Sequence, residues 1–263
     1  MKKFLVIGNP IQHSLSPLIH NYWIKKSNID AIYEKEKLEV GDLKNLISKL
    51  KKKIIHGINV TVPFKKDIIF YLEKLSPEAE RTQSVNTIYL ENNIVTGHNT
   101  DIDGFGLAIQ DIRFDVSNKH ILIVGAGGVV PSIIYSLIKM KAYKVYLTNR
   151  NREKAENLKK LFKDLILINW GEIQNYDMII NATSVGLNAS ERLNLDFSKI
   201  KNNKLFYDVI YNPKETNFLK NAKILGNKTE NGKKMFIYQA ALAFKIWHGV
   251  KPEINEKVEK LLD

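Results

Sequence analysis

The sequence contains no cysteine. This absence excludes disulfide bonds, thiolate metal sites and a cysteine nucleophile, and it suits a reducing compartment. Long hydrophobic runs are also missing, because no segment approaches the ~18 uninterrupted apolar residues of a membrane helix. The apolar stretch near the start covers only Phe4 to Ile7, which is shorter than the ~7–15 residues of a signal-peptide core. We therefore expect a soluble, cytoplasmic protein without a membrane partner.

Two further absences limit the chemistry. None of the six histidines is paired at the spacing of metal ligands, so we assign no metal. No G-x-S-x-G motif accompanies the serines, which disfavours a serine hydrolase.

Charge of one sign is abundant, since 40 Lys and Arg against 28 Asp and Glu give a formal net charge of +12. Such an excess could bind nucleic acid or steer an anionic ligand. We favour the simpler interpretation that the basic residues cover solvated helix faces and have no specific partner. The densest run, Lys49 with residues 51–53, lies at the end of a predicted helix and opposes the negative pole of its dipole. Aromatic and basic residues are not interleaved as in an RNA-binding sheet, so we expect no nucleic-acid partner.

Length and periodicity predict two α/β units. The 263 residues exceed the ~150 of a typical domain, and their 44% hydrophobic and 26% charged content is typical of a globular chain. In the first unit we expect strands over 3–8, 31–39 and 56–62, a helix capped by Ser16, a helix over 42–52, and a hairpin turning at Asn92-Asn93. From residue 119, apolar strands over 121–124, 145–147, 178–180 and 205–207 alternate with helices. This alternation predicts a doubly wound parallel sheet.

A glycine-rich turn opens the second unit. Gly125, Ala126, Gly127 and Gly128 follow a predicted strand and precede a helix, which is the setting in which backbone amides approach a pyrophosphate. The match to G-x-G-x-x-G is partial because residue 130 is valine. A tight turn without any ligand is the alternative.

The end of the next strand discriminates between dinucleotides. NAD-binding folds usually place a carboxylate there, about 20 residues past the glycines. This sequence has Asn149 and Arg150 instead, followed by Arg152 and Lys154. Guanidinium groups suit a 2′-phosphate, so we expect NADP rather than NAD. A solvated helix start is the alternative, although cations in a first helical turn face the unfavourable dipole pole.

Polar side chains gather where strands of the first unit end. Ser14 and Ser16 lie at a predicted helix N-terminus and could hold a small anion, whereas simple capping would explain only Ser16. The period of two places Asn59 and Thr61 on one strand face and Ile58, Val60 and Val62 on the other. Lys65 follows just beyond Pro63, at the carboxyl end of that strand, and is the best candidate for a catalytic base.

Asp101 and Gln239 complete the candidate site. A lysine and an aspartate that face one hydroxyl can share its proton while hydride leaves the same carbon, although Asp101 could equally be a helix N-cap. Gln239 interrupts an apolar helix, where an unpartnered amide would cost about 1–3 kcal/mol. We therefore expect a ligand or a core hydrogen bond at Gln239.

Together these segments resemble the shikimate dehydrogenase family. The resemblance is carried by residues 8–10, 14–17, 59–65, 85–87, 99–101, 125–128, 149–150, 181–184, 208 with 211–213, and 231–239. It implies reversible NADPH-dependent reduction of 3-dehydroshikimate to shikimate, on the route to chorismate and aromatic amino acids. It also implies a substrate-binding domain over 1–101 joined by helices over 236–263, an NADP-binding Rossmann domain over 102–235, and an active site in the cleft between them.

The resemblance further implies a role for individual residues. It makes Lys65 and Asp101 the catalytic pair. Substrate contacts would come from Ser14, Ser16, Asn59, Thr61, Asn86, Tyr211 and Gln239. NADP contacts would come from Gly125, Ala126, Gly127, Gly128, Val129, Asn149, Arg150, Arg152, Lys154, Thr183, Val209 and Gly232.

Some positions depart from the family pattern. Val129-Val130-Pro131 stand where small residues are usual, and Lys233-Lys234 stand where Leu-Gly is frequent. We expect these changes to alter cofactor affinity and not the reaction. An NAD-using quinate/shikimate dehydrogenase is the close alternative, and a non-catalytic nucleotide-binding regulator is a more distant one, disfavoured because both Lys65 and Asp101 are present. We expect a monomer or a homodimer.

Overall fold

The structure is a computed structural model that describes residues 1–263. The chain folds into two compact units, residues 1–104 with 237–263 and residues 105–236. The boundaries fall within two helices, α4 (Asp101–Asp111) and α8 (Lys233–His248). None of the helices combines the length and the apolar character needed to cross a membrane.

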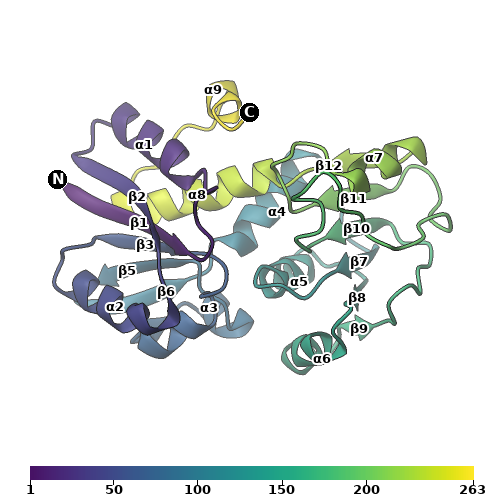
Figure 1. The fold of residues 1–263 in the computed structure, drawn as a ribbon, viewed down its shortest axis with the longest axis horizontal. Coiled ribbons are helices and arrows are strands. Elements are labelled where there is room, and N and C mark those ends of the chain that lie inside the picture. Colours follow the sequence, from purple (N-terminus) through teal and green to yellow (C-terminus); the bar gives the residue numbers. More distant parts are fainter. The chain divides into compact units, whose positions relative to one another are not determined.

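The first unit is built on a mixed six-stranded sheet in the order β2-β1-β3-β5-β6-β4, of which all strands but β4 are labelled in Figure 1. Strands β1, β2 and β3 are parallel to one another, and β5 is antiparallel to both β3 and β6. Its elements are β1 (Lys2–Gly8), α1 (Ser16–Lys26), β2 (Ala31–Lys37), η1 (Val40–Asp42), α2 (Leu43–Lys51), β3 (Gly57–Val60), η2 (Asp67–Tyr71), β4 (Lys74–Leu75), α3 (Pro77–Thr82), β5 (Thr87–Glu91), β6 (Ile94–His98) and α9 (Glu256–Lys260).

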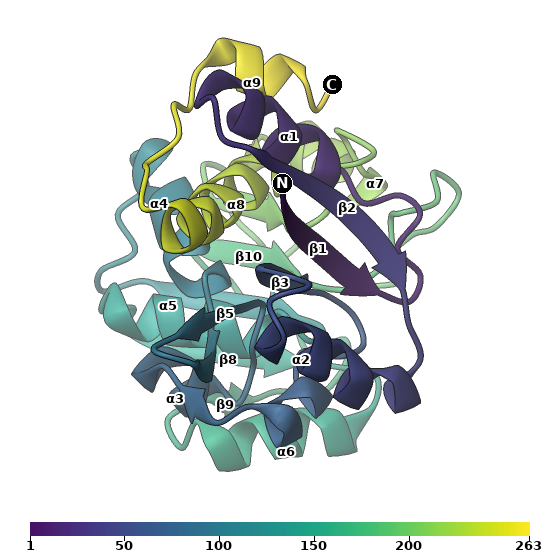
Figure 2. The same cartoon turned by 90° about the vertical axis from the view of Figure 1, so that its left-hand side faces the viewer.

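The two faces of this sheet bury different side chains, and helices α1 and α8 cover the opposite face from α2 (Figure 2). Leu5 and Ile58 join the apolar cluster under α2. The alternate residue Phe4 packs on Trp247 of α8, with ring centroids 5.2 Å apart, and Tyr33 stacks on His20 of α1. Since successive strand residues point to opposite faces, Asn59 lies on the α1 and α8 face.

The second unit is built on a fully parallel six-stranded sheet in the order β12-β11-β10-β7-β8-β9. Its central strands are almost completely buried, which explains their continuous apolar sequences. Its elements are β7 (His120–Val124), α5 (Val130–Lys139), β8 (Lys144–Thr148), α6 (Arg152–Leu161), β9 (Ile166–Leu167), β10 (Met178–Asn181), β11 (Leu205–Asp208), α7 (Asn217–Ile224) and β12 (Lys228–Glu230).

The predicted fold class is confirmed, with two α/β units and a doubly wound parallel sheet in the second. The hairpin turn is confirmed as well, because Asn92 and Asn93 both adopt positive φ angles of 52° and 63°. One detail differs. The strand expected to extend to Val62 ends at Val60, so Val62 is 55% exposed and does not share the buried face of Ile58.

Candidate active site

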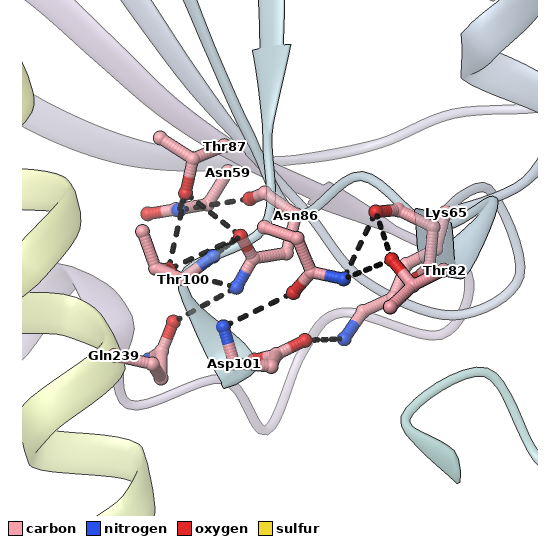
Figure 3. A network of polar contacts seen from close by, with 10 residues as sticks. Asn59, Lys65, Thr82, Asn86, Thr87, Thr100, Asp101 and Gln239 are labelled. Carbon is pink, nitrogen blue, oxygen red and sulfur yellow. Dashed lines mark hydrogen bonds and ion pairs between the residues drawn. The ribbon is translucent and has the colours of Figure 1, made fainter. Parts of the chain in front are cut away.

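A buried ion pair lies at the centre of the candidate site. Lys65 Nζ and Asp101 Oδ2 are 2.5 Å apart, and their side chains are only 11% and 8% exposed (Figure 3). The backbone holds both residues, because Val85 N donates to the Lys65 carbonyl at 2.9 Å and Asp101 N donates to Asn99 Oδ1 at 3.2 Å. The structure thus joins the two residues that the sequence analysis proposed to share a proton, although they are 36 positions apart.

Asn86 lies at the centre of a hydrogen-bonded network beside this pair. Its Oδ1 accepts from Thr100 N at 2.8 Å, and its Nδ2 donates to Gln239 Oε1 at 3.5 Å (Figure 3). The expectation that Gln239 would find a polar partner is therefore confirmed. Gly104 permits the approach, because a Cβ at residue 104 would lie 2.7 Å from the Cβ of Gln239.

Asn59 is bonded within the protein on both sides of its amide. Its Nδ2 donates to the Asn86 carbonyl at 2.9 Å and to Thr87 Oγ1 at 3.1 Å. Its Oδ1 accepts from the Tyr33 hydroxyl at 2.7 Å. Asn59 is 7% exposed, so it supports Asn86 from the buried side of the network.

The two serines differ from the expected arrangement. The prediction that Ser16 caps α1 was wrong, because the N-cap residue is Leu15 and no side chain caps the helix. The carbonyl of Leu15 already accepts from the N–H groups of Leu18 and Ile19, which a capping Ser16 would need. Ser14 Oγ instead accepts from Ser16 N at 3.3 Å, and the Ser16 hydroxyl partly offsets the rise that burial gives to the pKa of Tyr33.

Thr61 follows β3 and is half-buried. Its N–H donates to the Ile7 carbonyl at 2.9 Å. Gly8 leaves room for it, since a Cβ at residue 8 would lie 2.6 Å from Thr61 Cγ2. The ends of β1 and β3 therefore fit together only with glycine at position 8.

In the second unit, the glycine-rich turn packs closely against the segment that follows β10. Gly125 has a φ of +112°, and a Cβ there would lie 2.8 Å from the Ala182 carbonyl oxygen. At Gly127 the same carbonyl oxygen would be 3.6 Å away, which is an ordinary van der Waals contact, so this position does not require glycine for space. Helix α5 has no side-chain cap at Val129, and Val130 is fully buried. The unusual Val130 therefore packs into the core and does not narrow the turn.

The end of β8 carries the cations that the sequence predicts to bind a 2′-phosphate. Asn151 caps α6 by accepting from Lys154 N at 3.0 Å, and Asn149 Nδ2 donates to the Asn151 carbonyl at 2.7 Å. Arg152 is paired with Glu156 at 2.8 Å on the helix surface. Arg150 and Lys154 are exposed at the same end of the sheet.

The ends of β10 and β11 are tied together by a buried carboxylate that the sequence analysis did not single out as a site residue. Asp208 accepts from Asn181 Nδ2 at 3.1 Å, from Ile210 N at 3.0 Å and from Thr216 Oγ1 at 2.6 Å. Burial raises the pKa of Asp208 to about 6, against the opposing effect of these hydrogen bonds. Asn181 Oδ1 in turn accepts from Thr183 Oγ1 at 2.7 Å.

The remaining predicted residues of the second unit lie after β11. A Cβ at Gly232 would lie 2.1 Å from the Val209 carbonyl oxygen, so glycine is required there. Tyr211 stacks on Phe236 with ring centroids 4.7 Å apart, and burial raises its pKa to about 12. The chain contains no group of three or more acidic or histidine side chains arranged to hold a metal ion.

Known proteins match this chain over its whole length. Residues 6–88 match the family model described as shikimate dehydrogenase substrate binding domain, and residues 107–218 match that of shikimate / quinate 5-dehydrogenase. Residues 234–256 match that of the shikimate 5′-dehydrogenase C-terminal domain. The chain is 56% identical over 262 residues to a shikimate dehydrogenase (NADP(+)) of Pelagibacter ubique, with 100% of this chain and 99% of that protein covered. The chain belongs to the shikimate dehydrogenase family.

Solved structures of shikimate dehydrogenases have the same fold. One, in complex with NADP+, is 34% identical with a TM-score of 0.93, covering 100% of this chain and 94% of that one. Another, from Thermus thermophilus in complex with NADP(H) and shikimate, is 29% identical with a TM-score of 0.91, covering 100% and 98%. A third, from Listeria monocytogenes in complex with shikimate and NAD, is 28% identical with a TM-score of 0.92, covering 100% and 96%. The resemblance inferred from the sequence is thus confirmed.

Proposed function

We propose that this member of the shikimate dehydrogenase family reduces 3-dehydroshikimate to shikimate reversibly, with NADPH as the reductant. The observation that carries the proposal is the buried pair of Lys65 and Asp101, which lies beside a network of amide and hydroxyl groups. A relative named shikimate dehydrogenase (NADP(+)), 56% identical over 262 residues, supports the same activity.

The proposed chemistry requires one proton and one hydride. During reduction the carbonyl carbon gains a hydride and its oxygen gains a proton, and NADPH supplies the hydride when it is bound. We assign the proton to the Lys65 ammonium, which Asp101 holds in place. In the reverse direction the Lys65 amine accepts the proton of the substrate hydroxyl.

The substrate offers hydroxyl groups and a carboxylate, which match two sets of side chains. We assign the hydroxyls to Asn86, Gln239 and Thr61. We assign the carboxylate to Ser14 and Ser16, because they lie at the N-terminus of α1, where the helix dipole favours an anion. Asn59 supports Asn86, and Tyr211 stays a predicted contact in the second unit.

The cofactor residues proposed are those of the glycine-rich turn and of the strand ends in the second unit. The pyrophosphate is assigned to Gly125, Ala126, Gly127, Gly128 and Val129. The 2′-phosphate is assigned to Asn149, Arg150, Arg152 and Lys154, and the nicotinamide to Thr183, Val209 and Gly232. Asn149 and Arg150 follow β8 where NAD-binding folds usually carry a carboxylate, and this supports NADP over NAD.

We also propose that the enzyme acts in the cytoplasm as a monomer or a homodimer. The absence of cysteine supports a reducing compartment. Sedimentation of the purified protein would give its oligomeric state.

The activity is tested by mixing the purified protein with shikimate or quinate and with either NADP+ or NAD+, and recording the reduced nicotinamide. We expect kcat/KM with shikimate to be at least about tenfold higher for NADP+ than for NAD+, since a charge-assisted phosphate contact contributes about 1.5–3 kcal/mol. A preference for NAD+ would favour the quinate/shikimate alternative. Binding of NADP+ without turnover would favour a regulator.

A further inference from the structure

Tyr33 lies on β2, an edge strand with charged residues towards its end, and neighbouring groups hold both its side chain and its backbone. Its side chain is 1% exposed and stacks on His20, with ring centroids 4.2 Å apart and an interplanar angle of 2°. Asn21 holds its backbone through two hydrogen bonds, of 2.9 Å to the Tyr33 N–H and 2.8 Å to the carbonyl. The phenol ring therefore has one defined position.

The Tyr33 hydroxyl connects two residues assigned to the substrate site. It donates to Asn59 Oδ1 at 2.7 Å, and the Ser16 hydroxyl lies close enough to the phenol to lower its pKa against the larger effect of burial. A phenol has one hydrogen, and Asn59 takes it, so towards Tyr33 the Ser16 hydroxyl can act only as a donor. The hydroxyl hydrogens can therefore point in one direction only, from Ser16 to Tyr33 to Asn59.

Asn59 extends this chain to the centre of the site. Because its Oδ1 accepts from Tyr33, its Nδ2 must point towards the Asn86 carbonyl and Thr87 Oγ1. Thr87 Oγ1 in turn donates to Asn86 Oδ1 at 2.9 Å. The Thr100 N–H also donates to this oxygen, so Tyr33 adds to the hydrogen bonds that orient the Asn86 amide, through Asn59 and Thr87.

We propose that Tyr33 is a positioning residue for the substrate, whose hydroxyl orients Ser16 on one side and Asn59 on the other. This role rests on the proposed function. Without a ligand, the Tyr33 oxygen accepts the Ser16 hydrogen and keeps that hydroxyl in place. When a carboxylate takes the hydrogen, Tyr33 still donates to Asn59, so the exchange leaves no buried donor unsatisfied.

The test compares Tyr33→Phe with the wild-type protein in shikimate oxidation by NADP+. Phenylalanine keeps the ring and its stacking on His20, so the variant should fold. We expect KM for shikimate to rise about tenfold, the effect of one hydrogen bond to the site, while KM for NADP+ is unchanged and kcat stays within about threefold. The matched control is Tyr89→Phe on β5 of the same sheet, outside this network, which should leave both constants unchanged.

A purely structural role would give a different result. In that case Tyr33→Phe would lower the melting temperature and leave KM for shikimate at the wild-type value, which would overturn the proposal. A double-mutant cycle with Ser16→Ala adds an independent readout. If Tyr33 acts partly through Ser16, Tyr33→Phe should raise KM for shikimate by a smaller factor in the Ser16→Ala background. That factor should be less than half of the factor measured in the wild-type background. If the two substitutions instead raise KM by independent factors that multiply, the link between Tyr33 and Ser16 is contradicted. Failure of the wild-type protein to oxidise shikimate would instead refute the proposed function.

Discussion

Removing the Lys65 amine changes both stability and catalysis, and the structure gives the size of each effect. Lys65→Met leaves the Asp101 carboxylate, whose side chain is 8% exposed, without its cation at 2.5 Å. Breaking a buried ion pair from one side typically costs about 3–5 kcal/mol. Because domains are stable by only about 5–15 kcal/mol, inactivity of this variant alone could reflect unfolding.

A double variant separates the two effects. Lys65→Met with Asp101→Asn replaces both charges by neutral groups of similar volume, which is often neutral or stabilising for a buried pair. We expect its free energy of unfolding to return to within about 1 kcal/mol of the wild-type value. We expect its kcat to stay about 10²–10⁴-fold below wild type, because proton transfer has been lost.

The assays are urea unfolding and steady-state oxidation of shikimate. The matched control is the pair of Lys204 and Asp177 in the second unit, which is 2.8 Å apart and 21% and 26% exposed. Lys204→Met with Asp177→Asn should leave kcat unchanged. Wild-type turnover by the Lys65 and Asp101 double variant would refute the proton-transfer assignment. Wild-type stability of Lys65→Met would show that the pair is less buried than described.

Three further predictions concern titration and cofactor choice. Burial, with a smaller effect of His248, lowers the pKa of His20 from 6.5 to about 3. The folded protein therefore loses stability as the pH falls from 6.5 towards 3. His20→Phe should lose less of its free energy of unfolding over that range. The pKa of Asp208 is raised from 3.8 to about 6, so this group adds to the free energy of unfolding as the pH falls from 6 to 3.8. Asp208→Asn should remove up to about 3 kcal/mol of that increase, as measured in unfolding experiments. Arg150→Ala should raise KM for NADP+ about tenfold and leave KM for NAD+ unchanged.

Each of these predictions has its own contradicting result. Identical acid sensitivity of His20→Phe and wild type would mean that the histidine is protonated in the folded protein. A wild-type pH profile for Asp208→Asn would mean that this carboxylate keeps its ordinary pKa. An equal rise in KM for both cofactors after Arg150→Ala would assign the residue to a part that NADP+ and NAD+ share.

Much of the fold follows from local rules. The continuous apolar run from Ile121 to Val124 indicates a strand buried on both faces, and paired asparagines at 92 and 93 indicate a tight turn. Strands β4, β9 and β12 were missed because two or three residues show no period. Helix α3 was also missed, although Ser76 and Pro77 form a recognisable helix start.

The site was only partly predictable. Lys65 and Asp101 could be proposed because motif residues and the resemblance point to them together. Tyr33 could not, because its bond to Asn59 depends on register: Tyr33 pairs with Phe4 across β1, and Phe4 pairs with Gly57, two residues before Asn59. Periodicity gives the face on which a side chain lies and not its neighbour two strands away.

The central claim is that this chain moves a hydride directly between shikimate and NADP+. Shikimate that carries deuterium on the carbon of the oxidised hydroxyl tests it, with the cofactor analysed by mass spectrometry after turnover. Direct transfer predicts that the reduced cofactor carries one deuterium. Reduced cofactor that contains only ordinary hydrogen, or no reduced cofactor at all, would contradict the claim.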